Sequence, residues 1–132
     1  GTVINKLTLE GQIHGGIGQA VGQTLTERIV YDESGQLITG SFLDYAMPRA
    51  EDLCSIEIEG RPVPTDTNPL GVKGAGEAGC VGALPAVVNA VLDALKDHGV
   101  VHLEMPLTPE SVWRAIRDKG AFDPEGLMSD VL

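Results

Sequence analysis

The sequence predicts an α+β fold, in which a small antiparallel sheet packs with about three helices. Apolar residues recur every fourth position between residues 10 and 27, which is the spacing of one face of a helix. Apolar and polar residues alternate between residues 53 and 59, which is typical of a half-buried strand. A polar turn at residues 32–35 separates two short β-prone segments and indicates a hairpin.

The first predicted helix covers residues 10–27, with a stripe of Ile13, Ile17, Val21 and Leu25. The same segment contains several glycines, each costing up to about 1 kcal/mol relative to alanine inside a helix. Such a helix is expected where another helix or a ligand comes close to its backbone. Four of the glycines are spaced to form one smooth side, and both interpretations of that side remain open: Gly11, Gly15, Gly18 and Gly22.

The predicted hairpin pairs residues 28–31 with residues 36–39, and a further strand covers residues 53–59. Between them, residues 41–49 form an extended segment that stops at Pro48 and Arg49. The strands around Ile29, Ile38 and Ile56 are expected to form the floor that covers the helices.

Residues 61–82, rich in glycine and proline, predict a long loop, and loops of about twenty residues in a compact domain are usually functional or disordered. A second helix is expected to begin at Pro85 and to end at Gly99. Thr108, followed by proline and glutamate, predicts the start of a third helix that ends at Gly120. The tail beyond it is expected to be irregular, and residues 1–132 together a single domain.

Composition excludes several classes of function. Nine basic and 19 acidic residues give a formal net charge of −10, which argues against binding to nucleic acid or to anionic lipid. No uninterrupted apolar stretch reaches the roughly 18 residues of a membrane helix, so a cytoplasmic protein without membrane contact is expected. Cys54 and Cys80 are expected to be reduced thiols.

The glycine-rich stretch from Gly74 to Gly79 formally matches G-x-G-x-x-G. A dinucleotide-binding fingerprint must directly follow a strand, whereas Pro69 precedes this stretch, and Glu77 occupies a position where a pyrophosphate needs bare amides. A carboxylate on such a turn, shielded from water, could act as a general base. The residues alone leave open that Glu77 is instead an exposed helix-start residue favoured by the helix dipole.

Four motifs in order resemble the C-terminal part of the molybdenum-binding large subunit of molybdenum hydroxylases, the xanthine dehydrogenase, aldehyde oxidase and carbon monoxide dehydrogenase family. The catalytic-loop motif of that family resembles GVKGAGEAG at Gly71–Gly79, and its glycine-rich cofactor segment resembles EGQIHGGIGQ at Glu10–Gln19. DYAMPRA at residues 44–50 and MPLTPE at residues 105–110 also match. The resemblance covers nearly the whole chain.

The resemblance implies a catalytic base, Glu77, in an oxidoreductase that hydroxylates an electron-poor carbon with oxygen from water. It also implies that Gln12, Lys73, Gly74 and Gly76 line the site of the molybdenum–molybdopterin cofactor, with no metal ligand among this chain's own residues. The implied partners are the remaining molybdenum-binding domains, an iron–sulfur subunit, a flavin (FAD) subunit and a small-molecule substrate.

Family subunits are several times longer, so this chain is expected to be a cut fragment or a split subunit that is inactive alone and associates with itself. An alternative is a catalytically silent interaction module of the same fold, or an isolated piece with no activity of its own. The roles of His14, Gln19 and Cys80 stay open, with a structural or substrate-lining role favoured for His14. Metal binding by His98 and His102 is not expected, because Gly99 and Val100 lie between them.

Overall fold

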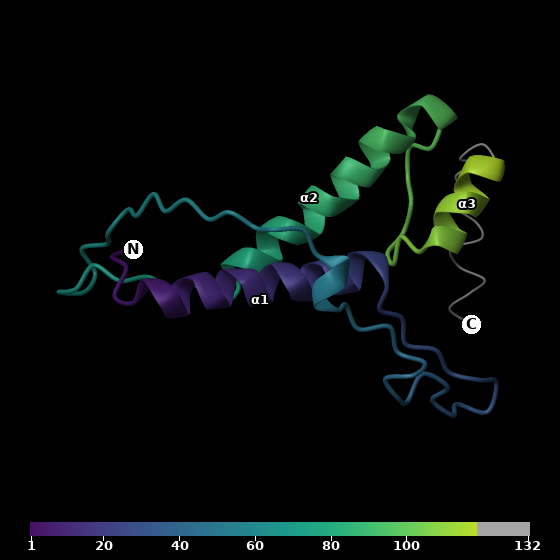
Figure 1. The fold of residues 1–132 in the computed structure, drawn as a ribbon, viewed down its shortest axis with the longest axis horizontal. Coiled ribbons are helices and arrows are strands. Elements are labelled where there is room, and N and C mark those ends of the chain that lie inside the picture. Colours follow the sequence, from purple (N-terminus) through teal and green to yellow (C-terminus); the bar gives the residue numbers. More distant parts are fainter. Residues whose placement is uncertain (119–132) are drawn as a thin grey trace.

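The computed structural model describes residues 1–118, and the expected end of the last helix at Gly120 and the expected irregular tail lie outside them. Within this range the chain forms three α-helices, α1 (Lys6–Leu25), α2 (Ala78–Leu95) and α3 (Pro109–Arg117), and two 3-10 turns, η1 (Ala50–Asp52) and η2 (Lys96–His98). In Figure 1, α2 rises from the middle of α1, and α3 lies beyond the C-terminal end of α1.

The predicted sheet is wrong, because residues 1–118 contain no β-strand. The predicted hairpin exists only as a turn with a single antiparallel bridge between Tyr31 and Leu37. Residues 53–64 run extended beside α1 without a neighbouring strand (Figure 1). Ile29 and Ile38 are 61% and 54% exposed, so they form no floor under the helices. Alternation correctly indicated extended backbone, but a sheet also needs a second strand, and the described chain supplies none.

Helix α1 begins four residues earlier than the sequence predicts. The side chain of Asn5 accepts a hydrogen bond from the backbone N–H of Thr8 at 3.0 Å, which caps the first turn. The helix ends at Leu25, where the backbone N–H groups of Thr26 and Glu27 both donate to the carbonyl of Gly22.

Helix α2 begins at Ala78 rather than at Pro85, so the proline lies inside the helix. Proline at that position removes one backbone hydrogen bond, yet the helix continues through it. The predicted terminator is confirmed, because the turn after α2 ends at Gly99 in the left-handed region with φ 78°.

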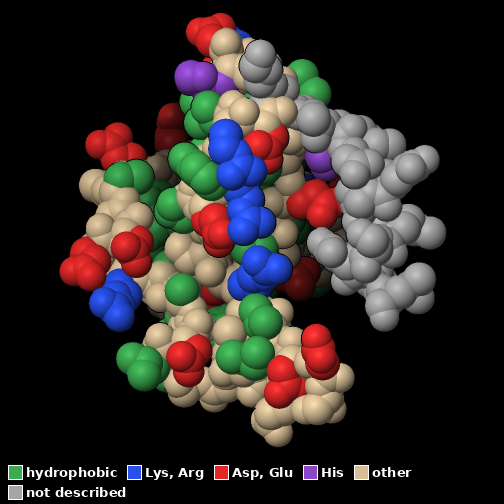
Figure 2. Space-filling view, turned by 90° about the vertical axis from the view of Figure 1, so that its right-hand side faces the viewer, with side chains coloured by type: hydrophobic (Ala, Val, Ile, Leu, Met, Phe, Trp, Pro, Cys, Tyr) green, Lys and Arg blue, Asp and Glu red, His purple; other side chains and the backbone are tan. Residues whose placement is uncertain are grey.

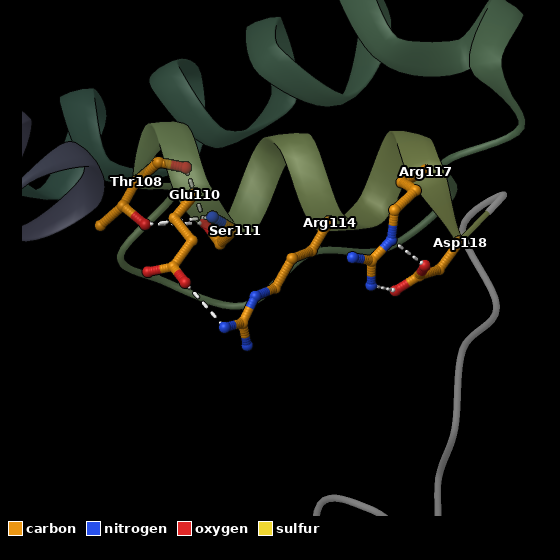
Figure 3. A network of polar contacts seen from close by, with 6 residues as sticks. All are labelled: Thr108, Glu110, Ser111, Arg114, Arg117 and Asp118. Carbon is orange, nitrogen blue, oxygen red and sulfur yellow. Dashed lines mark hydrogen bonds and ion pairs between the residues drawn. The ribbon is translucent and has the colours of Figure 1, made fainter.

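Helix α3 begins as predicted, with the Thr108 hydroxyl accepting from the backbone N–H of Ser111 at 3.2 Å. Figure 3 shows this cap together with an ion pair of Glu110 and Arg114 at 2.7 Å. Trp113 is 56% exposed and lies under the guanidinium group of Arg117. The apolar side of this short helix is therefore only partly covered.

Contact between α1 and α2 holds the described chain together. A Cβ atom built on Gly16 would lie 2.8 Å from the backbone nitrogen of Cys80, and one built on Gly79 would collide with the carbonyl of Ile13. The two helix backbones therefore touch directly at Gly16 and Gly79. This contact confirms that another helix comes close to the backbone of α1. It lies at Gly16 and not on the predicted smooth side, where Gly11 and Gly15 face open space.

Few side chains are fully enclosed. The buried apolar side chains of residues 1–118 are Ala20, Leu95, Val100 and Leu107. On the face shown in Figure 2, hydrophobic side chains reach the surface between basic and acidic ones.

Within residues 1–118, the stretch Ala78–His98 is long and apolar enough to cross a membrane, with mean hydropathy 1.7. Helices of that kind occur both in membranes and in the cores of larger proteins.

Candidate functional site

A pocket of about 750 Å³ opens at the N-terminal end of α1. Four segments line it: the N-terminal residues 1–5, the first two turns of α1, residues 59–62 of the extended segment, and residues 72–76 of the glycine-rich loop together with Ala78. Its volume lies within the range of sites that hold small molecules and cofactors.

A bend at Gly71 holds two of these segments together. The Gly71 carbonyl accepts hydrogen bonds from the backbone N–H of Thr2 at 2.8 Å and of Thr65 at 3.2 Å. Gly71 itself is left-handed with φ 65°, a conformation that other residues rarely adopt. The Asn68 side chain adds two bonds to the backbone of Val72, donating to its carbonyl and accepting from its N–H. The loop therefore enters the pocket with a fixed direction.

The glycine-rich loop presents bare backbone to the pocket. No hydrogen bond within residues 1–118 uses the backbone N–H groups of residues 73–76. A Cβ atom at Gly74 or at Gly76 would meet nothing within 4 Å. Residues 74–76 therefore offer unpaired N–H donors, and a bound group can approach Gly74 and Gly76 closely, whereas Gly1 lies against the backbone nitrogen of Lys73.

Four of the five sequence-predicted site residues line this one pocket: Gln12, Lys73, Gly74 and Gly76. The structure thus brings together two motifs that lie about 60 positions apart in the sequence. Gln12 contributes an amide, which can both donate and accept.

Glu77, the fifth predicted residue, lies between the pocket-lining residues Gly76 and Ala78. It stands at the N-cap of α2 and makes no capping hydrogen bond with its side chain. Glu77 is exposed, so the described residues do not give its carboxylate the expected shielding from water. Contact between Gly79 and Ile13 nevertheless fixes its backbone beside the turn of α1 that carries Gln12.

Sequence reasoning missed two walls of the pocket. The N-terminal residues 1–5 and residues 59–62, among them Arg61, carry no recognisable motif. Asn5 as a helix cap was the one available signal that the N-terminal residues are ordered beside α1. The position of residues 59–62 follows from tertiary contacts alone.

Three further residues of uncertain role are now placed. His14 lies on α1 with its Nε2 atom 3.2 Å from the carbonyl oxygen of Ile56. Gln19 is exposed on the same helix, and Cys80 is half-buried at the start of α2. Cys80 and the exposed Cys54 are both free cysteines. Within the described residues, no group of three or more His, Cys, Asp or Glu side chains could hold a metal ion.

Comparison with known proteins gives consistent matches. Residues 1–54 match the family model of a molybdopterin cofactor-binding domain. Over 96% of its length the chain is 45% identical to the nicotine 6-hydroxylase large subunit of Paenarthrobacter nicotinovorans. Over 89% it is 35% identical to the carbon monoxide dehydrogenase large chain of Hydrogenophaga pseudoflava. The chain spans about 15% of the length of each of these relatives.

Solved structures agree with these matches. The crystal structure of quinoline 2-oxidoreductase from Pseudomonas putida 86 superposes with a TM-score of 0.85 at 46% identity, covering 89% of this chain and 15% of that one. A copper- and molybdenum-containing carbon monoxide dehydrogenase superposes with a TM-score of 0.84 at 34% identity, covering 93% of this chain and 16% of that one.

Proposed function

Because the chain belongs to the molybdenum hydroxylase large-subunit family, of which it represents one segment, we propose that it forms part of the cofactor pocket of such an oxidoreductase and supplies its catalytic base. The observation that carries this proposal is the convergence of Gln12 and the loop residues Lys73, Gly74 and Gly76 on one pocket.

The residues present fit a molybdenum–molybdopterin group. The pocket volume of about 750 Å³ suits a group of that size, and the open space at Gly74 and Gly76 lets it reach the backbone. Gln12 and the unpaired N–H groups of residues 74–76 would bind its polar edge. When bound, the cofactor supplies the redox chemistry that inserts oxygen from water into an electron-poor carbon.

Glu77 would act as the general base of that reaction. An ionised carboxylate accepts one proton, and it must lie within hydrogen-bond reach of the group that loses it. The start of α2 would position Glu77 at the rim of the pocket, since both neighbouring residues line it. Other segments of the enzyme would supply the shielding from water that residues 1–118 do not give.

The proposed substrate is an aromatic N-heterocycle, which the enzyme would hydroxylate at an electron-poor carbon. Two of the relatives with 45% or more identity are named for nicotine and quinoline, whereas the carbon monoxide dehydrogenases are 34–36% identical. Iron–sulfur and flavin subunits would carry the electrons away, and the enzyme would work in the cytoplasm, where cysteines are ordinarily reduced.

Substitution of Glu77→Gln in the assembled enzyme tests this function. We expect kcat to fall by about 10²–10⁴-fold, the usual contribution of a general base, with the molybdenum content unchanged. Quinoline, nicotine and carbon monoxide serve as the probe substrates, with reduction of an artificial electron acceptor as the assay.

The matched control is Glu57→Gln, which removes the same charge from an exposed residue outside the pocket lining. Its turnover is expected to equal that of the unmodified enzyme. Full turnover by Glu77→Gln would instead favour the alternative, a catalytically silent interaction module of the same fold.

A further inference from the structure

We propose that His14 is a positioning residue that fastens the extended segment, residues 53–64, to α1 and thereby fixes one wall of the pocket. The fastening follows from contacts within this chain. Its consequence for cofactor retention rests on the proposed function.

The fastening is one hydrogen bond between distant parts of the sequence. His14 Nε2 lies 3.2 Å from the carbonyl oxygen of Ile56, 42 positions further along. A carbonyl oxygen can only accept, so the imidazole must carry its hydrogen on Nε2 and donate it. His14 directly follows Gln12 and Ile13, which both line the pocket.

The extended segment has few other attachments. At one end, the Leu53 side chain packs against Gly18 of α1, since its Cδ1 atom would lie 3.6 Å from a Cβ atom built on that glycine. At the other end, the backbone N–H of Thr65 donates to the Gly71 carbonyl. The other hydrogen bonds of the described segment are local, from the Leu53 N–H to the Ala50 carbonyl and from Arg61 to Glu59. His14 therefore holds the segment at Ile56, between the attachments at Leu53 and at Thr65.

Burial of the segment beyond Ile58 adds nothing to this hydrogen bond. Ile56 and Ile58 are half-buried, whereas Glu57 and all of residues 59–64 are exposed. The pocket wall formed by residues 59–62 begins three residues after Ile56. An extended chain rises about 3.3 Å per residue, so the wall lies only about 10–20 Å of chain beyond the fastening point. Release of Ile56 would therefore loosen the wall directly.

The test compares His14→Gln with His14→Leu in the assembled enzyme. The glutamine amide places an N–H donor close to the position of Nε2, whereas leucine keeps the bulk and removes the donor. His98→Leu serves as the control, because His98 is an exposed histidine on η2 that does not line the pocket. One readout is the rate at which a glutamate-specific protease cuts after Glu57 and Glu59, and the other is molybdenum content after gel filtration.

We expect His14→Leu to be cut roughly two- to tenfold faster, as loss of one ordinary hydrogen bond implies, and to lose molybdenum. His14→Gln and His98→Leu should match the unmodified enzyme in both readouts. An unchanged cutting rate in His14→Leu would overturn the fastening, and so would equal defects in His14→Gln and His14→Leu. Faster cutting with full molybdenum content would overturn the link to the pocket. Each of these results is independent of the Glu77→Gln experiment, which tests the proposed function separately.

Discussion

Thr24 lies in the last turn of α1 with no exposed surface, and its hydroxyl oxygen has no hydrogen-bond partner among the described residues. Its backbone carbonyl accepts from the N–H of Leu107 at 2.6 Å, which joins α1 to the segment that leads into α3. A buried hydroxyl without a partner costs about 1–3 kcal/mol, because it has lost its hydrogen bonds to water.

Replacing Thr24 with valine is therefore expected to raise the free energy of unfolding by about 1 kcal/mol, since the shape is kept and the unpaired hydroxyl is removed. Denaturant unfolding measures the change. Thr26→Val is the matched control, because the Thr26 hydroxyl donates to the Ala46 carbonyl at 2.6 Å and its loss should destabilise the protein. A loss of stability in Thr24→Val equal to that of Thr26→Val would contradict the prediction.

Asp32 organises the exposed turn at residues 32–36. Hydrogen bonds from the Ser34 hydroxyl and from the Gln36 N–H hold the pKa of the Asp32 carboxyl below its ordinary value. A lowered pKa means that the folded turn favours the ionised form. This stabilisation is fully present above the ordinary pKa of 3.8 and is lost as the pH falls through the lower folded value.

Acidification below pH 3.8 is accordingly expected to loosen this turn, and Asp32→Asn should abolish that dependence because an amide oxygen accepts at any pH. Amide NMR shifts of Ser34 and Gln36 across a pH titration report the change. A titration that persists in Asp32→Asn would assign it to another group.

At the scale of elements, the α1–α2 contact depends on two glycines that have no room for a side chain. Gly16→Ala places a methyl group 2.8 Å from the backbone nitrogen of Cys80, which neither helix can move cheaply. We expect a loss of about 1–3 kcal/mol in unfolding free energy, typical of overpacking.

Gly11→Ala is the matched control on the same helix, since nothing lies within 4 Å of a Cβ atom there. It is expected to raise stability by up to about 1 kcal/mol through helix propensity alone. Thermal unfolding of both variants checks the contrast, and equal effects of the two substitutions would refute the packing role of Gly16.

The helices show how far local sequence patterns predict this fold. The cap at Thr108 and the terminator Gly99 were predictable, because each depends on a residue's own backbone preferences. The start of α2 was not, because proline at position 85 is tolerated inside the helix. The glycine contact was predictable in kind, but its place at Gly16 depends on where α2 crosses α1.

The extended segments and the site residues were likewise predictable only in part. Alternation at residues 53–59 indicated extended backbone but could not reveal whether a partner strand exists. Gln12 and Gly74 were identified from sequence motifs that resemble those of the family, and the structure places both in one pocket. Residues 59–62 carry no motif, so only the fold could reveal their place in the wall.

At the scale of the whole molecule, the described chain leaves much apolar surface open. Large apolar side chains in three separate parts of the chain are at least half exposed, among them Phe42, Leu43, Val81 and Trp113. Exposed apolar surface on this scale is typical of interaction sites, which agrees with a chain that spans about 15% of its relatives' length.

The 132-residue chain by itself is therefore expected to associate with itself and to retain no molybdenum. Its net charge of −10 opposes association, so added salt should strengthen association by screening that repulsion. Sedimentation velocity at low and high ionic strength, with metal analysis of the separated species, measures both effects. A monomer that keeps molybdenum would contradict the expectation.

The bend at Gly71 has a mechanical consequence for the pocket. One carbonyl receives both Thr2 and Thr65, so the two ends of a stretch of more than sixty residues meet at a single peptide group. Any side chain at Gly71 would strain its φ of 65° and press on Pro64 and on the Thr2 hydroxyl at once. We therefore expect Thr2 and Thr65 to reach their places at this rim of the pocket together, so that disturbing one displaces the other.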